Sequence, residues 1–368
     1  MAVQPAPKKN SPCVCGSGKK FRKCCGSPKV WEAMRLQYQR RTAARARYES
    51  KFGKVKDIQY TDHNGTKLVV VGGEFYWPHP DHPWRSFPDF LDSHLKNQFG
   101  EKWWRTEWAK PLAECHPLVQ AERALKAVLQ RAPQKPGELV MVTGDGAAAE
   151  YALVCYDLYL ARHHELFSRR ILNRLRDTNQ YHGARVELAA ASAFLRAGFK
   201  LEMEDEKDGS RKHPEFVAVD PSSGFRIDVE AKRRHRRDGD SSERLGVEPL
   251  IRDAVEKVRD QPFALFLELN APPREGRPLP LPWLEEINAA LDAHARRPEP
   301  SSPNGKVDVF SLIIISNRWH QPGQPADFRR TTAVPINAMR PVPKAVFEAM
   351  MLAMAQAGTV PNEFPKDL

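Results

Sequence analysis

The sequence lacks any long apolar segment. The opening MAVQPAPKKN contains no apolar core of the length that a secretory signal needs, and no run along the 368 residues approaches the length of a membrane span. We therefore expect a cytoplasmic protein that has no membrane partner. With 41% apolar residues, the chain still has enough to bury a core, so we expect a globular protein with appendages.

Acidic residues are scarce at the start of the chain. Met1 to Ser50 contains twelve Lys and Arg residues but only Glu32 and Glu49, so this part holds nearly all of the formal net charge of +11. A local cationic segment of this kind favours binding to a polyanion such as nucleic acid. The alternative is a solvated basic helix that has no specific partner.

Cysteines are also few, and most of them lie together. Of the six, Cys115 and Cys155 stand alone, whereas four follow the spacing C-x-C-x8-C-C near the start of the chain. In a reducing compartment such a cluster is typical of a metal site rather than of disulfides. Four thiolates close a tetrahedral zinc shell, which makes the site structural and not catalytic. The zinc ligands would be Cys13, Cys15, Cys24 and Cys25; free reduced cysteines are the alternative.

The stretch SPCVCGSGKKFRKCCG resembles the SEC-C motif, a short zinc-binding element found at the carboxy terminus of the preprotein translocase ATPase and appended to many bacterial proteins. The resemblance covers about sixteen residues and includes the GSGKKF segment between the cysteines. It implies one bound zinc ion and a docking role toward a protein or ribosome partner.

Patterning along the rest of the chain predicts an α/β fold: a mixed central sheet flanked by helices, preceded by the zinc module and a helical region. Alternating or apolar runs predict strands at residues 66–78, 200–203, 215–219, 225–231, 262–269 and 309–315. The predicted regions are a zinc module (1–28), a basic helix or linker (29–52), a mainly helical region with an early strand or hairpin (53–180), the α/β core (181–320) and a proline-punctuated tail with a helix (321–368).

An acidic pair is predicted within the core. If Glu215 to Val219 and Phe225 to Ala231 form a hairpin, Glu215 faces Glu230 across the two strands, at a Cβ distance of about 5 Å. Two facing carboxylates repel each other unless a cation lies between them, and a divalent ion with oxygen ligands satisfies them well. The alternative is an ordinary solvated face of a hairpin.

A third carboxylate follows from helical geometry. In YHGARVELAAASAFLRAG, the residues Arg185, Ser192 and Arg196 lie on the side of the helix opposite Glu187. This places Glu187 on the apolar face, which is expected to pack against the sheet. Its carboxylate would then point at the same ion, or it would be the buried partner of an arginine or a backbone amide.

The order of these residues resembles the PD-(D/E)XK nuclease superfamily, which has a restriction-endonuclease-like fold. The similarity covers Tyr181 to about Leu269 and rests on PEF followed by IDVEAK. By this resemblance the helix acid is Glu187, the hairpin acid Glu215, the second acid Glu230 and the lysine Lys232.

The resemblance implies Mg²⁺-dependent cutting of phosphodiester bonds in DNA or RNA. Glu215, Glu230 and the Ala231 carbonyl would hold the ion, while Lys232 would orient or deprotonate water or offset charge in the transition state. Adjacent phosphates would be gripped by Arg233, Arg234, Arg236 and Arg237. Because the family usually has Asp where this chain has Glu215, an inactive descendant that binds nucleic acid or the ribosome stays open as an alternative. A third possibility is an adaptor that docks a protein partner through its zinc module.

Overall fold

The computed structural model describes residues 8–13, 15, 17–63, 66–132, 144–166, 169–203, 213–235, 245–271, 281–302, 305–319, 323, 327–335 and 337–364. The chain divides into two compact units, one formed by Met1–Lys51 with Pro365–Leu368 and the other by Phe52–Phe364. The predicted regions 53–180, 181–320 and 321–368 therefore fall almost wholly within the second unit. Within the described ranges, no helix is both long and apolar enough to cross a membrane.

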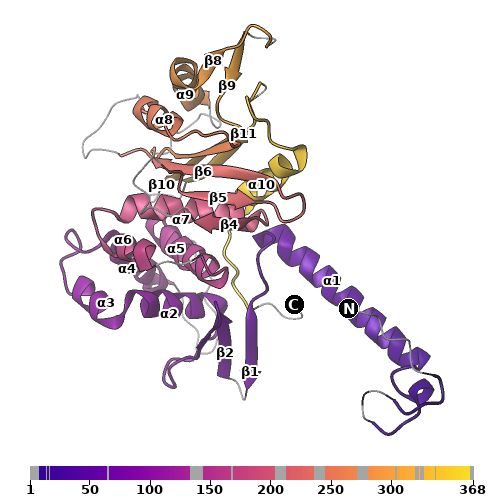
Figure 1. The fold of residues 1–368 in the computed structure, drawn as a ribbon. Helices are drawn as coiled ribbons and strands as arrows, with labels where there is room; N and C mark the ends of the chain where they lie inside the picture. Colours follow the sequence, from indigo (N-terminus) through magenta and orange to yellow (C-terminus); the bar gives the residue numbers. More distant parts are fainter. Residues whose placement is uncertain are drawn as a thin grey trace. The chain divides into compact units, whose positions relative to one another are not determined.

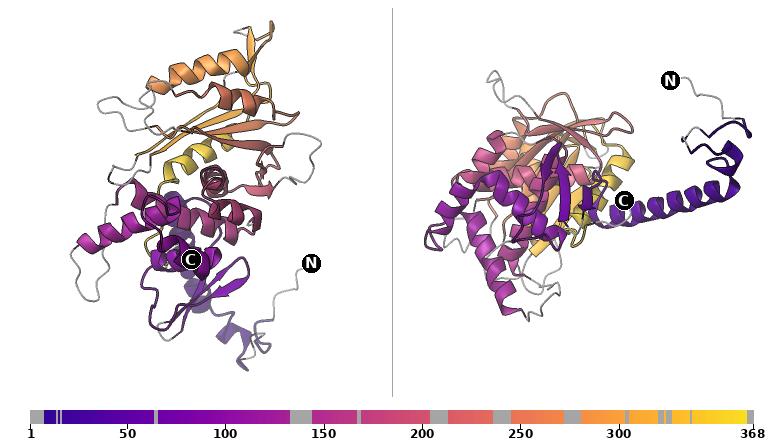
Figure 2. Two further views of the ribbon diagram at one scale, coloured as in Figure 1. Left: turned by 90° about the vertical axis from the view of Figure 1, so that its left-hand side faces the viewer. Right: turned by 90° about the horizontal axis from the view of Figure 1, so that it is seen from below.

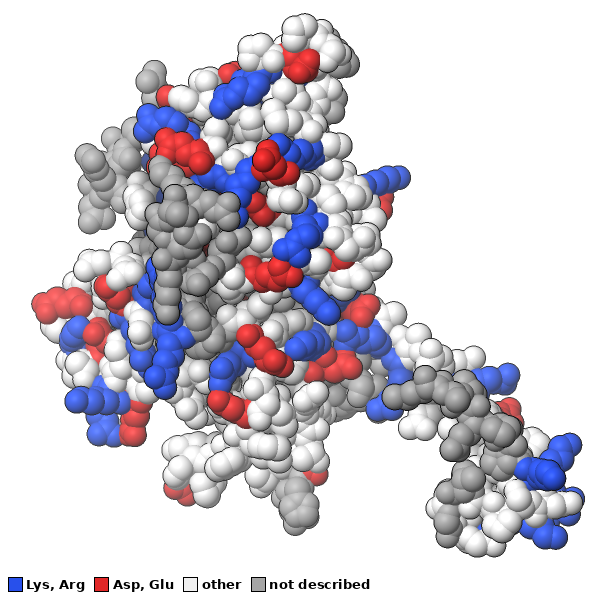
Figure 3. Space-filling view, viewed as in Figure 1, with Lys and Arg blue, Asp and Glu red and all other residues white. Residues whose placement is uncertain are grey.

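The first unit consists of the cysteine module and a single long helix. A short 3₁₀ helix, η1 (Phe21–Lys23), precedes α1 (Pro28–Phe52). The helix predicted here is thus present; the segment lacks Gly and is rich in Ala and Arg, both of which favour helix formation. Lys and Arg side chains gather around the cysteine module (Figure 3). Five large apolar side chains are exposed on α1, namely Val30, Trp31, Met34, Leu36 and Tyr38.

The second unit begins with a small sheet and a group of helices. Its antiparallel sheet contains β1 (Gln59–His63), β2 (Thr66–Val71) and β3 (Glu74–Tyr76). The helices that follow are α2 (Phe87–Phe99), α3 (Glu101–Trp108), α4 (Pro117–Arg131), α5 (Gly146–His163) and α6 (Arg169–Arg176). Trp104 is buried and its indole donates to Glu122 at 3.2 Å. The tryptophan-rich stretch therefore contributes to the core.

A six-stranded mixed sheet forms the centre of this unit. Its order is β11-β10-β7-β6-β5-β4, in which β6, β7 and β10 are mutually parallel and the other neighbours are antiparallel. The strands are β4 (Lys200–Met203), β5 (Phe216–Val219), β6 (Arg226–Arg233), β7 (Phe263–Glu268), β10 (Leu312–Trp319) and β11 (Asp327–Ala333). A separate hairpin is formed by β8 (Arg296–Pro298) and β9 (Lys306–Asp308).

Helices cover both faces of the large sheet (Figures 1 and 2). On one face lies α7 (Tyr181–Arg196), backed by α5, and on the other lie α8 (Glu248–Val255) and α9 (Leu281–His294). The last helix, α10 (Lys344–Gln356), packs against α7 and β11. The predicted mixed sheet flanked by helices is thus present.

One sequence interpretation of α7 is wrong. Arg185, Ser192 and Arg196, which were placed on the side away from the core, are 5%, 2% and 1% exposed. Helix α7 is enclosed, because the sheet covers one side and α5 and α10 cover others. Arg185 pairs with Glu150 at 2.6 Å, and the guanidinium of Arg196 donates to backbone carbonyls, among them that of Gln356. Buried polar groups need such partners, and here the neighbouring segments supply them.

Candidate functional site

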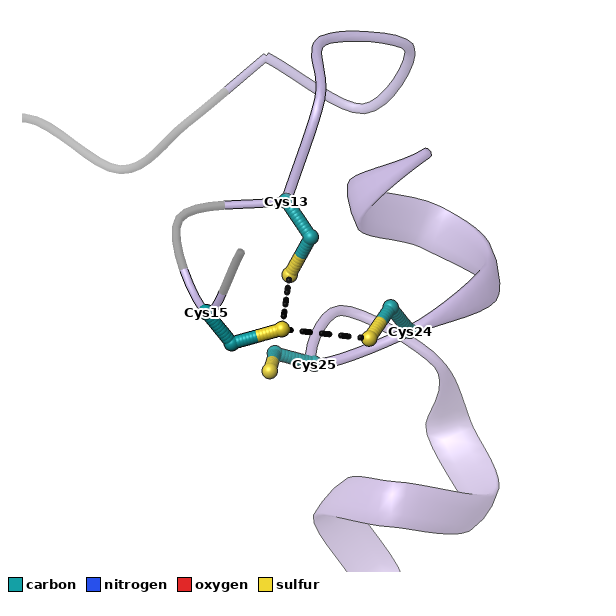
Figure 4. Close-up of side chains that lie close together, drawn as sticks. All are labelled: Cys13, Cys15, Cys24 and Cys25. Atoms are coloured by element: carbon teal, nitrogen blue, oxygen red, sulfur yellow. Dashed lines mark hydrogen bonds between the residues drawn. The ribbon is translucent and has the colours of Figure 1, made fainter. Parts of the chain in front are cut away.

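The four clustered cysteines lie around one point in the first unit (Figure 4). Their sulfur atoms all lie within 4.8 Å of one another, and Cys15 Sγ is 3.4 Å from Cys13 Sγ and 3.5 Å from Cys24 Sγ. A tetrahedral zinc shell with bonds of about 2.3 Å separates its sulfurs by roughly 3.8 Å, so a zinc ion fits this arrangement. Among the residues that the structure describes, this is the one group of His, Cys, Asp and Glu ligands so closely gathered.

Backbone hydrogen bonds hold the cysteine module in shape. The Cys13 amide donates to the Lys19 carbonyl at 2.8 Å, and the Phe21 amide donates to the Ser11 carbonyl at 2.9 Å. Gly18 turns the chain between them with φ of +70°, a conformation that favours glycine. Hydrogen bonding from the hydroxyl and then the backbone of Ser17 lowers the pKa of the Cys15 thiol to about 6. The lower pKa favours the thiolate form, which is the form that binds metal.

The acidic hairpin in the second unit has the predicted register. Phe216 pairs with Val229 and Val217 with Asp228, and the Glu215 amide donates to the Val229 carbonyl at 2.9 Å. Glu215 therefore stands at the start of β5, opposite the carboxyl-terminal half of β6. The solvated-face alternative is wrong for β6, because Asp228 is 2% exposed and Glu230 is 0% exposed. A carboxylate buried to this degree requires compensation.

Lys257, in the turn that follows α8, supplies that compensation. Its ammonium lies 2.7 Å from Glu230 Oε1, 2.9 Å from Glu230 Oε2 and 3.7 Å from Glu215 Oε1. Lys232, predicted as the family's lysine, lies 3.1 Å from Glu230 Oε1, and its side chain is 20% exposed. The two sheet acids thus share one cation, as the facing carboxylates required. Sequence reasoning did not find Lys257, because nothing in its local pattern distinguishes it from other lysines.

The carboxylate of Glu187 is paired with an arginine side chain. Both of its carboxylate oxygens accept from Arg174 of α6, at 2.6 and 2.5 Å. This is the alternative that the sequence left open for Glu187. Among the described residues, Glu187, Glu215 and Glu230 are not found as a group of closely gathered metal ligands.

The three acids nevertheless influence one another. Burial, followed by the charges of Glu187 and then Glu230, raises the pKa of Glu215 to about 8, while Lys257 and Arg174 oppose the increase. A carboxylic acid with so high a pKa is the expected result of gathering like charges in a partly dry site. Perturbed carboxylates of this kind occur most often at functional sites.

The arginines that follow Lys232 in the sequence lie in different environments. Arg233 lines a cavity on the other face of the sheet. Arg234 is 6% exposed, and its guanidinium donates to the backbone carbonyls of Leu245 and Asn270. It therefore ties β6 to neighbouring segments instead of facing solvent, where a phosphate would lie. Arg236 and Arg237 lie outside the described residues.

Comparison with known proteins identifies one segment. Residues 10–27 match the family described as the SEC-C motif. No curated protein matches the chain, and no solved structure matches it. The SEC-C match and the geometry of its four cysteines together indicate metal binding by the first unit.

Proposed function

We propose that the second unit is a metal-dependent phosphodiesterase that acts on nucleic acid, and that the first unit is a structural zinc module used for docking. The observation that carries the proposal is the single ammonium of Lys257 shared by Glu215 and Glu230. A buried carboxylate, Glu230, and a partly buried one, Glu215, converge on one cation and form a site where positive charge is required. Their order along the chain supports a restriction-endonuclease-like core.

The residues present fit a divalent cation such as Mg²⁺. The donor set is made of carboxylate oxygens, which this ion prefers, and the place is already one where a cation is stabilised. Glu215 and Glu230 would hold the ion, with the Ala231 carbonyl nearby on the same strand. Mg²⁺ bound there would polarise the scissile phosphate and lower the pKa of a bound water. Glu187 fits less directly, since Arg174 engages both of its oxygens.

The surrounding side chains would divide the remaining tasks. Lys232, whose ammonium is bound to Glu230 and partly exposed, would orient a water molecule or offset negative charge on the phosphoryl group. Lys257 would move away from the carboxylates and offer its charge to a neighbouring phosphate. Arg174 and Glu187 would hold each other in place and, through their opposite charges, adjust the proton affinity of Glu215.

Hydrolysis by the purified chain tests this proposal. Plasmid DNA, linear DNA, single-stranded DNA and RNA are each incubated with Mg²⁺ or Mn²⁺, with and without a chelator. We expect cutting that depends on the added ion and that falls by about 10²-fold or more in Lys232→Ala, the usual cost of losing one transition-state contact. Lys200→Ala is the matched control, because Lys200 is an exposed lysine on β4 of the same sheet.

Two results would contradict the catalytic proposal. Absence of hydrolysis on all four substrates with either ion would remove it, and equal cutting by Lys232→Ala and the native chain would remove Lys232 from the site. Zinc in the first unit is monitored separately, by metal analysis of the same samples, so that damage to that unit is not mistaken for loss of catalysis.

Nucleic-acid binding without hydrolysis is the second candidate function. Two observations favour it: Lys257 and Arg174 already neutralise the acids, and basic side chains gather on the first unit (Figure 3). It predicts affinity for DNA or RNA that falls steeply with salt, because bound phosphates release counterions. A protein adaptor that docks through the SEC-C segment, on a ribosome or on another partner, would show no such dependence.

A further inference from the structure

A cavity of about 200 Å³ lies on the face of the sheet opposite Lys257. It opens at the carboxyl ends of β6, β7 and β10, where α4, α5 and α7 close around them. Successive residues of a strand point to opposite faces of the sheet. Arg233 therefore lines this cavity, whereas Lys232 lies on the opposite face, beside Glu230. Its charged lining consists of Glu150, Arg185, Arg233, Glu268 and Arg318, together with His182.

Two of the three arginines share acidic partners on α5. Arg185 lies 2.6 Å from Glu150 and 2.8 Å from Asp157. Arg318 is 7% exposed, and its Nη1 is 3.5 Å from the same Asp157. Within the described residues, Nε of Arg318 has no hydrogen-bond acceptor. The carboxylate of Asp157 thus serves two guanidinium groups.

Arg233 adds a third positive charge. Within the described part of the chain its guanidinium has no hydrogen bond or ion pair; burial lowers the pKa of this group, and the nearby charges of Glu268 and Glu150 oppose the decrease. Its neighbour in the strand register is Glu268, whose Oε1 accepts from the amides of Arg318 at 2.8 Å and Asn270 at 3.1 Å. Glu268 Oε2 is buried without a hydrogen-bond partner among the described residues.

The carboxylates of the lining, Glu150 and Glu268, are fewer than its arginines. Burial raises the pKa of the Glu268 carboxyl, while the amides of Arg318 and Asn270 and the charges of Arg318 and Arg233 oppose the increase. The lining thus holds three guanidinium groups and two carboxylates, so it presents guanidinium donors and a surplus of positive charge.

We propose that this cavity binds the phosphate group of a phosphomonoester. A phosphate dianion accepts several hydrogen bonds at once and matches the planar donors of arginine. The volume is several times the roughly 30 Å³ that a water molecule occupies, so an attached sugar also fits. A phosphate inside a chain carries two substituents, whereas a cavity of this size suits a free phosphate, a mononucleotide or the end of a strand.

Binding is independent of hydrolysis and is measured without divalent ions. The zinc-loaded full chain is titrated with inorganic phosphate, adenosine 5′-monophosphate and adenosine, and isothermal calorimetry and melting temperature are recorded. We expect the two phosphate compounds to bind and to raise the melting temperature, and adenosine to do neither. Oligonucleotides with a 5′-phosphate or a 5′-hydroxyl then distinguish a strand end from a free nucleotide.

Variants locate the binding in the cavity. Arg233→Gln should weaken phosphate binding about tenfold or more, the usual effect of losing one charge-assisted contact. Arg226→Gln, an exposed arginine at the other end of β6, should leave it unchanged. Arg233→Lys keeps the charge and should fall between the two, which provides a folded comparison if the glutamine variant is unstable. No binding of phosphate or nucleotide by the native chain, or equal binding by all three variants, would overturn the proposal.

Discussion

The ammonium of Lys257 lies within 2.9 Å of both carboxylate oxygens of Glu230, which is 0% exposed. The two residues come from different elements, a turn after α8 and the middle of β6. A buried ion pair of this kind is weak support for overall stability, but breaking it by removing one partner is costly. Lys257 is therefore both a structural counter-ion and a competitor for any metal ion that Glu215 and Glu230 would hold.

Removal of that counter-ion is expected to destabilise the second unit. In Lys257→Met, Lys232 is the one lysine that still pairs with the carboxylate of Glu230. The free energy of unfolding should therefore fall by about 3 kcal/mol. Urea denaturation followed by circular dichroism measures it, with Lys200→Met as the control for an exposed lysine. Added Mg²⁺ should restore part of the loss in Lys257→Met, since the ion replaces the missing charge. A variant as stable as the native chain would contradict the compensating role of Lys257.

The proton on Glu215 makes stability depend on pH. Its pKa is raised from 4.5 to about 8, mainly by burial and then by Glu187 and Glu230. The unfolded chain loses this proton near 4.5, whereas the folded chain keeps it until about 8. Between these values the folded state binds more protons, so this group lowers stability as pH rises.

Glu215→Gln removes this titration while keeping the shape of the neutral acid. In metal-free buffer, the variant should exceed the native chain by about 2–4 kcal/mol above pH 8, and the difference should vanish near pH 5. Glu202→Gln should change the free energy of unfolding in the opposite direction. Hydrogen bonding to Arg226 lowers the pKa of Glu202, so loss of this carboxylate should slightly reduce stability at neutral pH. Equal slopes of unfolding free energy against pH in the native and Glu215→Gln chains would refute the raised pKa.

The acidic hairpin could be predicted from sequence because its determinants are local. A short turn fixes the register, and alternation assigns each side chain to one face. The partners of the acids could not be predicted in this way. Lys257 is 27 residues from Glu230, and Arg174 is 13 residues from Glu187 on a separate helix. Both contacts depend on how the elements pack, which no local pattern records.

Elements that tertiary packing stabilises were also missed. β11 has the polar sequence DFRRTTA and forms because the edge of β10 offers it a full antiparallel partner. Arg185 and Arg196 were placed outside because polar residues usually lie there, yet Glu150 and a set of carbonyls receive them inside. The cysteine site, in contrast, was predicted from residue type and spacing alone, because its ligands lie close together in the chain.

Zinc removal should unfold the cysteine module without unfolding the second unit, because the two units are compact separately. We expect one zinc per chain by atomic absorption, and loss of that ion in Cys15→Ser, since three thiolates leave the tetrahedral shell incomplete. Cys155→Ala is the matched control, because Cys155 is buried in α5 of the second unit and is not one of the four clustered cysteines. Zinc that persists in Cys15→Ser and is lost in Cys155→Ala would contradict the assignment of the ligands.

The tight packing of the cysteine module requires a glycine at position 26. A Cβ atom at this position would lie 2.6 Å from the Phe21 ring and 2.9 Å from the Phe21 carbonyl oxygen, which accepts the Gly26 amide. The ring can turn away, but the carbonyl cannot move without shifting η1 and the adjacent Cys24 and Cys25. Gly26→Ala should therefore weaken zinc binding about tenfold in competition with a chromophoric chelator, by displacing two ligands at once.

Gly18→Ala separates this steric effect from backbone strain. An added Cβ would meet nothing within 4 Å at Gly18, but its φ of +70° costs a residue other than glycine about 1 kcal/mol. That cost corresponds to a loss of zinc affinity of roughly fivefold, smaller than the loss expected for Gly26→Ala. If Gly18→Ala proves the more damaging of the two, the turn and not the contact with Phe21 limits how the cysteines come together.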